Sequence, residues 1–102
     1  MDLEIFVQAY VECLTWLQSE TEFYNISREE MNKIENDCKH FIKRASKYLQ
    51  GLDASQCGHD FYLTRNGHGS GFWDRDYDEK IEVMLCKISK DMGECYIGLG
   101  GE

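Results

Sequence analysis

Apolar residues recur at steps of three and four in two stretches of the N-terminal half, the spacing that places side chains on one face of an α-helix. In residues 2–19 the repeat consists of Leu3, Val7, Tyr10, Leu14 and Leu17, with Phe6, Val11 and Cys13 beside it. In the second stretch it consists of Met31, Ile34, Cys38, Phe41, Ala45, Tyr48 and Leu52. Because only about seven residues separate the two stretches, we predict an antiparallel hairpin of helices over residues 1–52.

The second predicted helix carries signals at both ends. Ser27 and Glu30 match the Ser-x-x-Glu pattern of a capping box, in which each side chain satisfies a free backbone N–H of the other residue. Gly51 follows the helix and suits the left-handed conformation that ends many helices. The sequence therefore predicts a helix that begins at Ser27 and ends at Gly51.

The pattern changes after Gly51. Residues 61–64 alternate and are rich in strand-forming types. The dipeptide Asn66-Gly67 follows, and it is the strongest short signal for a β-hairpin. We therefore predict a hairpin with strands at residues 59–65 and 68–73.

The C-terminal part returns to helical spacing. Asp74, Asp76 and Asp78 lie around the predicted start of a third helix, and Gly93 closes it. Its apolar face consists of Ile81, Met84, Leu85 and Ile88. Residues 95–97 read as a last short strand.

The predicted order is therefore α-α-β-β-α-β, which defines an α+β fold. The helical hairpin and the third helix would pack on a small, mostly antiparallel sheet. A chain of 102 residues fits one domain, 1–102, with the helical hairpin in residues 1–52 and the β-hairpin, third helix and terminal strand in residues 58–102.

The chain is acidic, and its charge is unevenly placed. The formal net charge is −8, and residues 1–37 hold nine acids against two bases. Residues 38–52 instead hold four bases and no acid; the bases are Lys39, Lys43, Arg44 and Lys47. Nucleic-acid phosphates repel such a chain overall, so we expect no direct nucleic-acid binding and a partner with a basic surface.

The expected cellular location of the protein follows from three features that its sequence lacks. No apolar run approaches the ~20 residues that cross a bilayer. The N-terminus starts with acids and lacks the basic flank of a signal peptide. The five cysteines form an odd set without Cys-x-x-Cys spacing, as expected for reduced thiols. We therefore expect a cytoplasmic protein with no membrane association.

The segment from Gly58 to Arg75 concentrates histidines, acids, arginines, aromatic residues and glycines. A tight aromatic hairpin would explain most of these residues structurally. In such a hairpin Arg65 would pair with His68. A recognition surface there would use Arg65, His68 and Trp73.

Two chemical alternatives remain for the same segment. A zinc site would use Cys57, His59 and His68, with Cys86 or Cys95, although Cys57-Gly58-His59 is an atypical spacing. A small hydrolase would use His59 or His68 as the base, Asp60 to orient it and Arg65 to hold an anion. No Gly-x-Ser-x-Gly elbow, P-loop or His-Glu-x-x-His motif is present, so we expect neither an enzyme nor a cofactor.

The string GHDFYLTRNGHGSGFWDR, residues 58–75, resembles the signature GHDFWLTRNGHGAGFWDR of a family of small uncharacterised bacteriophage and plasmid proteins. It covers about a fifth of the chain and departs from the signature at Tyr62 and Ser70. The resemblance implies an accessory protein of a phage or mobile element. It implies no activity, so no catalytic residue is carried over.

The acids suggest how such a protein would act. Carboxylates can imitate DNA phosphates toward the basic groove of a nuclease or repressor. The helices offer Glu4, Glu12, Glu20, Glu22, Glu29, Glu30 and Glu35, and the region of the third helix offers Asp74, Asp76, Asp78, Glu79 and Glu82. The plainer interpretation is a charged surface that keeps a small domain soluble.

We therefore predict a non-enzymatic protein that binds and inhibits a host protein, such as a defence or nucleic-acid enzyme, in the host cytoplasm. The predicted binding residues are Glu20, Glu22, Glu29, Glu30, Asp74, Asp76, Asp78, Glu79, Arg65, His68 and Trp73. The alternative is a small-ligand or metal module on the Gly/His/aromatic hairpin. A homodimer formed through the helical stripes is the alternative assembly.

Overall fold

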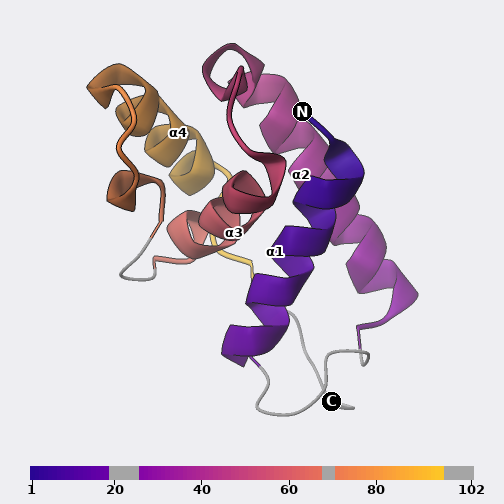
Figure 1. The fold of residues 1–102 in the computed structure, drawn as a ribbon. Coiled ribbons are helices and arrows are strands. Elements are labelled where there is room, and N and C mark those ends of the chain that lie inside the picture. The colour runs from indigo at the N-terminus through magenta and orange to yellow at the C-terminus, as the bar shows by residue number, and fades with distance from the viewer. Residues whose placement is uncertain (19–25, 68–70, 96–102) are drawn as a thin grey trace.

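A computed structural model describes residues 1–18, 26–67 and 71–95, and this part of the chain is helical (Figure 1). Its elements are α1 (Leu3–Gln18), α2 (Arg28–Leu49), α3 (Ala54–Arg65), the short 3-10 helix η1 (Phe72–Asp74) and α4 (Glu79–Asp91). The described residues contain no strand, so the predicted α+β fold with a sheet is wrong.

The first two helices are confirmed, and they run antiparallel in Figure 1. The Ser27 hydroxyl accepts from the Glu30 backbone N–H at 3.1 Å, and the Glu30 carboxylate accepts from the Ser27 N–H at 3.4 Å. Both halves of the predicted capping box are thus present. Gly51, with φ +80°, lies in the left-handed conformation just after α2.

The predicted first strand, residues 59–65, is part of helix α3 instead. Asp53 caps this helix, because its carboxylate accepts from the Gln56 backbone N–H at 3.1 Å. Asn66-Gly67 ends α3 and does not turn a hairpin: Gly67 has φ +72°, and its N–H donates to the Thr64 carbonyl at 3.3 Å. Glycine in a left-handed conformation suits both a helix end and a hairpin turn, so this dipeptide does not distinguish them.

The second predicted strand is wrong as well. Phe72 and Trp73 lie in η1, while residues 68–70 lie outside the described residues. The last predicted strand is not seen at Cys95, and its residues 96 and 97 lie outside the described part of the chain.

Helix α3 lies between α1 and α4 (Figure 1), and α1 makes its most extensive helix contact with α3. In α3 the polar residues Asp60, Thr64 and Arg65 are buried together with the apolar Phe61 and Tyr62. Polar and apolar residues therefore do not separate into two faces that would reveal the helical period. Phe61 stacks on Phe41 of α2 with ring centroids 4.3 Å apart. The central position of α3 therefore explains why its sequence resembles a buried strand.

The core face of α1 is rotated relative to the predicted stripe. Phe6 and Cys13, predicted to flank the stripe, are fully buried, whereas Leu17 is 46% exposed. On α2 the last buried residue is Leu49, while the predicted Leu52 is only half-buried. On α4 the buried positions are Leu85, Ile88 and Ser89. The buried face of α1 is the face that packs against α3, and no local sequence pattern predicted where α3 would pack.

Helix α4 begins and ends as the sequence predicted. Asp78 caps its N-terminus by accepting from the Lys80 N–H at 2.9 Å, and Gly93 follows it with φ +82°. Within the described ranges, no helix is both long and apolar enough to cross a membrane.

Candidate functional site

An ion pair between the buried Asp60 and the half-buried Arg75 joins the two ends of the signature segment. Asp60 of α3 is fully buried, and Arg75, just after η1, donates from Nε and Nη2 to its two oxygens at 2.8 and 2.9 Å. This bidentate geometry is the strongest that arginine and carboxylate can form. The Thr64 hydroxyl accepts from the Phe72 N–H at 3.1 Å nearby. These contacts fold the segment back on α3, so Asp60 holds the structure together and faces no open cavity.

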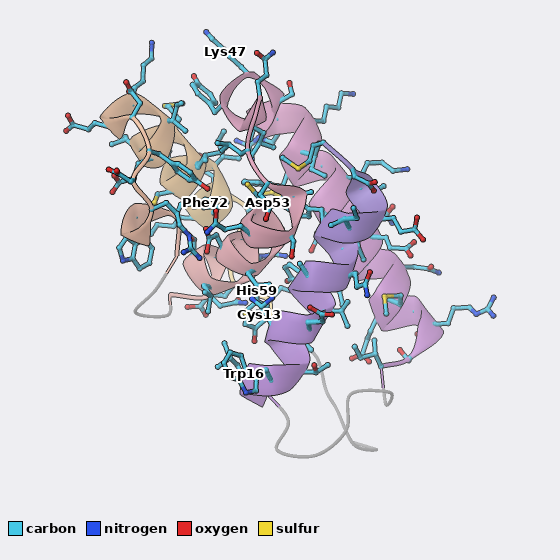
Figure 2. All side chains as sticks on the ribbon, viewed as in Figure 1. Cys13, Trp16, Lys47, Asp53, His59 and Phe72 are labelled. Carbon is cyan, nitrogen blue, oxygen red and sulfur yellow. The ribbon has the colours of Figure 1, made fainter. Side chains whose placement is uncertain are left out.

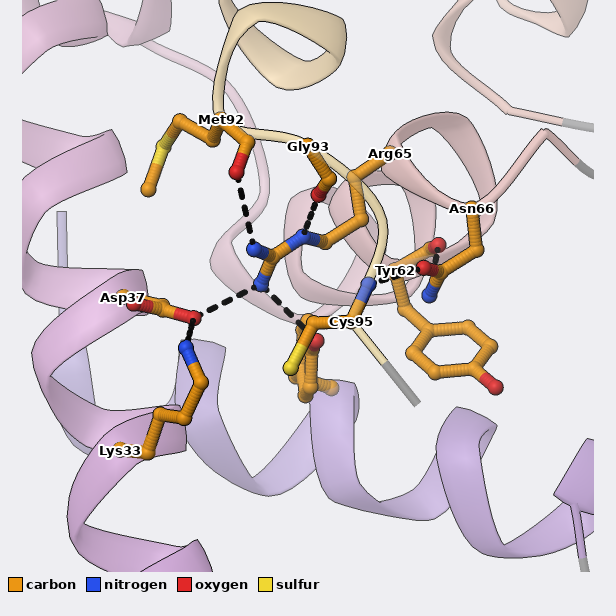
Figure 3. Close-up of polar contacts among 9 residues, drawn as sticks. Lys33, Asp37, Tyr62, Arg65, Asn66, Met92, Gly93 and Cys95 are labelled. Carbon is orange, nitrogen blue, oxygen red and sulfur yellow. Dashed lines mark hydrogen bonds and ion pairs between the residues drawn. The ribbon is translucent and has the colours of Figure 1, made fainter. Parts of the chain in front are cut away.

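The buried arginine Arg65 joins four parts of the chain (Figure 3). Arg65, 4% exposed, donates to the Asp37 carboxylate of α2 at 3.0 Å and to the Tyr10 hydroxyl of α1 at 3.2 Å. It also donates to the carbonyls of Gly93 at 2.8 Å and Met92 at 3.4 Å. The structure thus places this predicted binding residue in the interior.

Asn66, next to Arg65, fixes the segment after α4. Its side-chain oxygen accepts from the Cys95 N–H at 2.7 Å, and its amide nitrogen donates to the Tyr62 carbonyl at 3.1 Å. Asn66 is therefore buried for a structural reason: it satisfies the Tyr62 carbonyl in the last turn of α3 and the backbone N–H of Cys95 in the segment after α4.

Of the two histidines proposed for chemistry, the structure describes His59. The half-buried His59 side chain extends from α3 toward α1 (Figure 2). Its Nε2 lies 3.9 Å from the Glu12 carboxylate of α1. Asp60 is engaged by Arg75 instead, and His68 lies outside the described residues. The described residues include no group of three or more His, Cys, Asp or Glu side chains that could hold a metal ion.

All five cysteines are free thiols, and three of them, Cys13, Cys38 and Cys57, are buried. Burial, reinforced by the Asp60 carboxylate, raises the pKa of the Cys13 thiol to about 11 and that of Cys57 to about 12. Burial also raises the pKa of Cys38. These thiols are core residues that stay protonated at neutral pH, which makes them poor nucleophiles and metal ligands.

The protein should lose stability in alkaline solution. Between the ordinary thiol pKa of 9.0 and about 11, an unfolded Cys13 is deprotonated while the folded one keeps its proton. The unfolded state then binds fewer protons, so raising the pH lowers the free energy of unfolding, by about 1.4 kcal/mol per pH unit for each such thiol. Urea denaturation at several pH values measures this slope. The variant Cys13→Ala should show a shallower slope, and an equal slope would contradict the assignment.

The described binding acids of the prediction fall into two groups, one at the start of α2 and one around η1 and the start of α4. Glu29 is exposed on the first turn of α2, where Glu30 serves the capping box. Asp76, Asp78 and Glu79 are exposed near the start of α4, and Asp74 lies in η1. Glu20 and Glu22 lie outside the described residues. The first turn of α2 and the start of α4 lie on opposite sides of the molecule in Figure 1, so the described acids form two separate groups.

A groove lies between α1 and α2, and we define it by the residues that line two adjoining hollows. The hollows have volumes of about 240 and 330 Å³ and share Glu4 and Val7. The groove residues are the apolar Leu3, Val7, Val11 and Met31, the acidic Glu4, Glu12 and Glu35, and Gln8. These described lining residues include three carboxylates and no base.

The apolar groove residues fall on or beside the predicted apolar stripes, so they were expected in the core and no groove was predicted. The signal that could have found it is the width of the apolar face on α1. Leu3, Val7 and Val11 form one row at steps of four, and Phe6, Tyr10 and Cys13 form a second. Helix α3 covers the second row, while Leu3 and Val11 remain half-buried.

Two other surface features stand apart from the groove. Trp16 is 78% exposed at the C-terminal end of α1 (Figure 2). The other predicted aromatic contact, Trp73, is half-buried with the Lys90 ammonium 5.8 Å from its ring centroid. The bases Lys39, Lys43 and Lys47 are exposed along the second half of α2, and Lys47 lies at the opposite end of the molecule from Trp16 (Figure 2).

Comparison with known proteins gives no relative: no family model, curated protein or solved structure matches the chain.

Proposed function

We propose that this protein acts by binding another protein through the groove between α1 and α2, and that the partner presents a basic surface. The groove combines exposed apolar area with a one-sided charge, which is how protein-binding surfaces differ from an ordinary solvated face. The single observation that carries the proposal is the row of half-buried apolar side chains bordered by Glu4, Glu12 and Glu35.

The interior supports a binding role over a catalytic one. Asp60 and Arg65, the strongest candidates for chemistry in the signature segment, are both used to hold helices together. In the segment that resembles the phage and plasmid signature, Asp60 and Arg65 therefore stabilise the fold. We propose that the chain is an accessory protein of a phage or mobile element and that it inhibits a host protein.

Capture from a lysate of the host cell tests the proposal with matched variants. Glu4→Gln/Glu35→Gln removes two carboxylates from the groove, and Asp76→Asn/Glu79→Gln removes two from the start of α4. We expect the wild type and the second variant to retain the same protein, and the first variant to lose most of it at moderate salt. Retention of no protein by the wild type contradicts the proposed function. Loss caused only by the second variant contradicts the choice of surface.

A further inference from the structure

We infer that the groove between α1 and α2 takes one amphipathic helix of the partner, with an apolar ridge flanked by lysine or arginine. This inference rests on the proposed function, because it names the element of the partner that the same surface would bind. It concerns the shape and charge of the groove, and not the identity of the partner.

The dimensions of the groove fit a helix. On α1 its lining runs from Leu3 to Glu12, which at 1.5 Å per residue corresponds to roughly 14 Å, or two and a half helical turns. A helix contributes apolar side chains at i, i+3, i+4 and i+7 over that length, the usual anchors of a helix bound in a groove. An extended peptide normally adds to a sheet edge, and the described residues provide no strand.

The apolar floor has a shape that a ridge could enter. Val7 lies deepest, at 9% exposure, while Leu3 and Val11 on α1 and Met31 on α2 are half-buried around it. Methionine adapts its flexible side chain to different partners more easily than branched residues do. A ridge of leucine or similar side chains would cover these four residues and exclude water from them.

The carboxylates at the edge of the groove determine which charges the partner helix should carry beside its apolar ridge. Glu4, Glu12 and Glu35 are all exposed, and their side chains border the floor on both α1 and α2. Glu12 lies 3.9 Å from His59 Nε2, while Glu4 and Glu35 form no ion pair with another described residue. Lysine or arginine on both flanks of the helix would meet these carboxylates, whereas an acidic helix would be repelled.

A designed peptide tests the inference directly. The probe is a labelled peptide of about 16 residues with leucines at i, i+3, i+4 and i+7 and lysines on both flanks. A scrambled peptide of the same composition shares its charge but cannot form the ridge. Fluorescence anisotropy should give a Kd in the range of tens of micromolar for the first peptide, and at least about tenfold weaker binding for the scrambled one.

Variants of the protein then locate the binding surface. Gln8→Lys changes an exposed groove residue, so the fold should tolerate it, and it should weaken the designed peptide at least tenfold. Glu4→Gln/Glu35→Gln should weaken binding several-fold and reduce its dependence on salt. Val83→Lys, at a 54% exposed position on α4, is the matched control and should leave the Kd unchanged.

Four results would overturn the inference, the first three of which concern the binding surface. Equal binding of the scrambled peptide would show attraction by charge alone. An unchanged Kd in Gln8→Lys would place the peptide elsewhere. A dimer in sedimentation equilibrium that Gln8→Lys dissociates would show that a second copy occupies the groove. If lysate capture depends on the groove while the designed peptide does not bind, only the helical partner is refuted and the proposed function stands.

Discussion

Replacing Arg75 with methionine is expected to lower the free energy of unfolding by about 3–5 kcal/mol, because the fully buried Asp60 carboxylate loses both of its charged hydrogen bonds. Removing one partner of a buried ion pair is more harmful than removing both, since the remaining charge stays in a medium that solvates it poorly. Urea or thermal denaturation, followed by circular dichroism, measures the loss.

The double variant Asp60→Leu/Arg75→Met separates the orphaned charge from the loss of packing. It should recover more than half of the stability that Arg75→Met loses, because no unpaired charge remains inside. The control Lys87→Met removes one partner of an exposed ion pair, Lys87–Asp91 at 3.3 Å, and should change stability by less than about 0.5 kcal/mol. If Arg75→Met is as mild as this control, Asp60 is not held as the structure describes.

Replacing Gly58 with alanine should lower the free energy of unfolding by about 2 kcal/mol, although alanine favours helices. Gly58 lies in α3 against α1, and a Cβ there would overlap the Phe6 carbonyl oxygen and touch the Ala9 methyl group. A backbone carbonyl cannot move aside like a side chain, so α1 and α3 would have to separate. The aromatic contacts that Phe61 of α3 makes with Phe6 and Tyr10 of α1 would then loosen.

Gly67→Ala is the matched control for this prediction. No atom lies within 4 Å of a Cβ built at Gly67, so only its positive φ of +72° opposes alanine. The expected loss of about 1 kcal/mol measures backbone strain alone. A Gly58→Ala variant that is as stable as the wild type would show that α1 and α3 do not pack this closely. Because α1 forms one wall of the groove, its displacement should also weaken peptide binding.

The charge of the candidate site could be predicted from the sequence, but its shape could not. The acidity of the first helices and the suggestion of a basic partner came from counting charges, and Glu4, Glu12 and Glu35 were among the acids considered. The groove itself was not predictable, since its floor consists of apolar residues that looked like ordinary core positions. Which of them stay accessible depends on where α3 packs, and α3 was predicted to be a strand.

By itself, the sequence determined the features that depend on neighbouring residues. The capping box at Ser27 and Glu30 and the glycines after α2 and α4 set helix ends through contacts within one turn, and periodic apolar residues identified α1, α2 and α4. Tertiary structure alone decided that residues 54–65 form a helix, because polar and apolar residues are buried together in this segment and leave it no amphipathic period. It also decided the roles of Asp60 and Arg65, whose partners lie 15 and 28 residues away and become neighbours only when the helices pack.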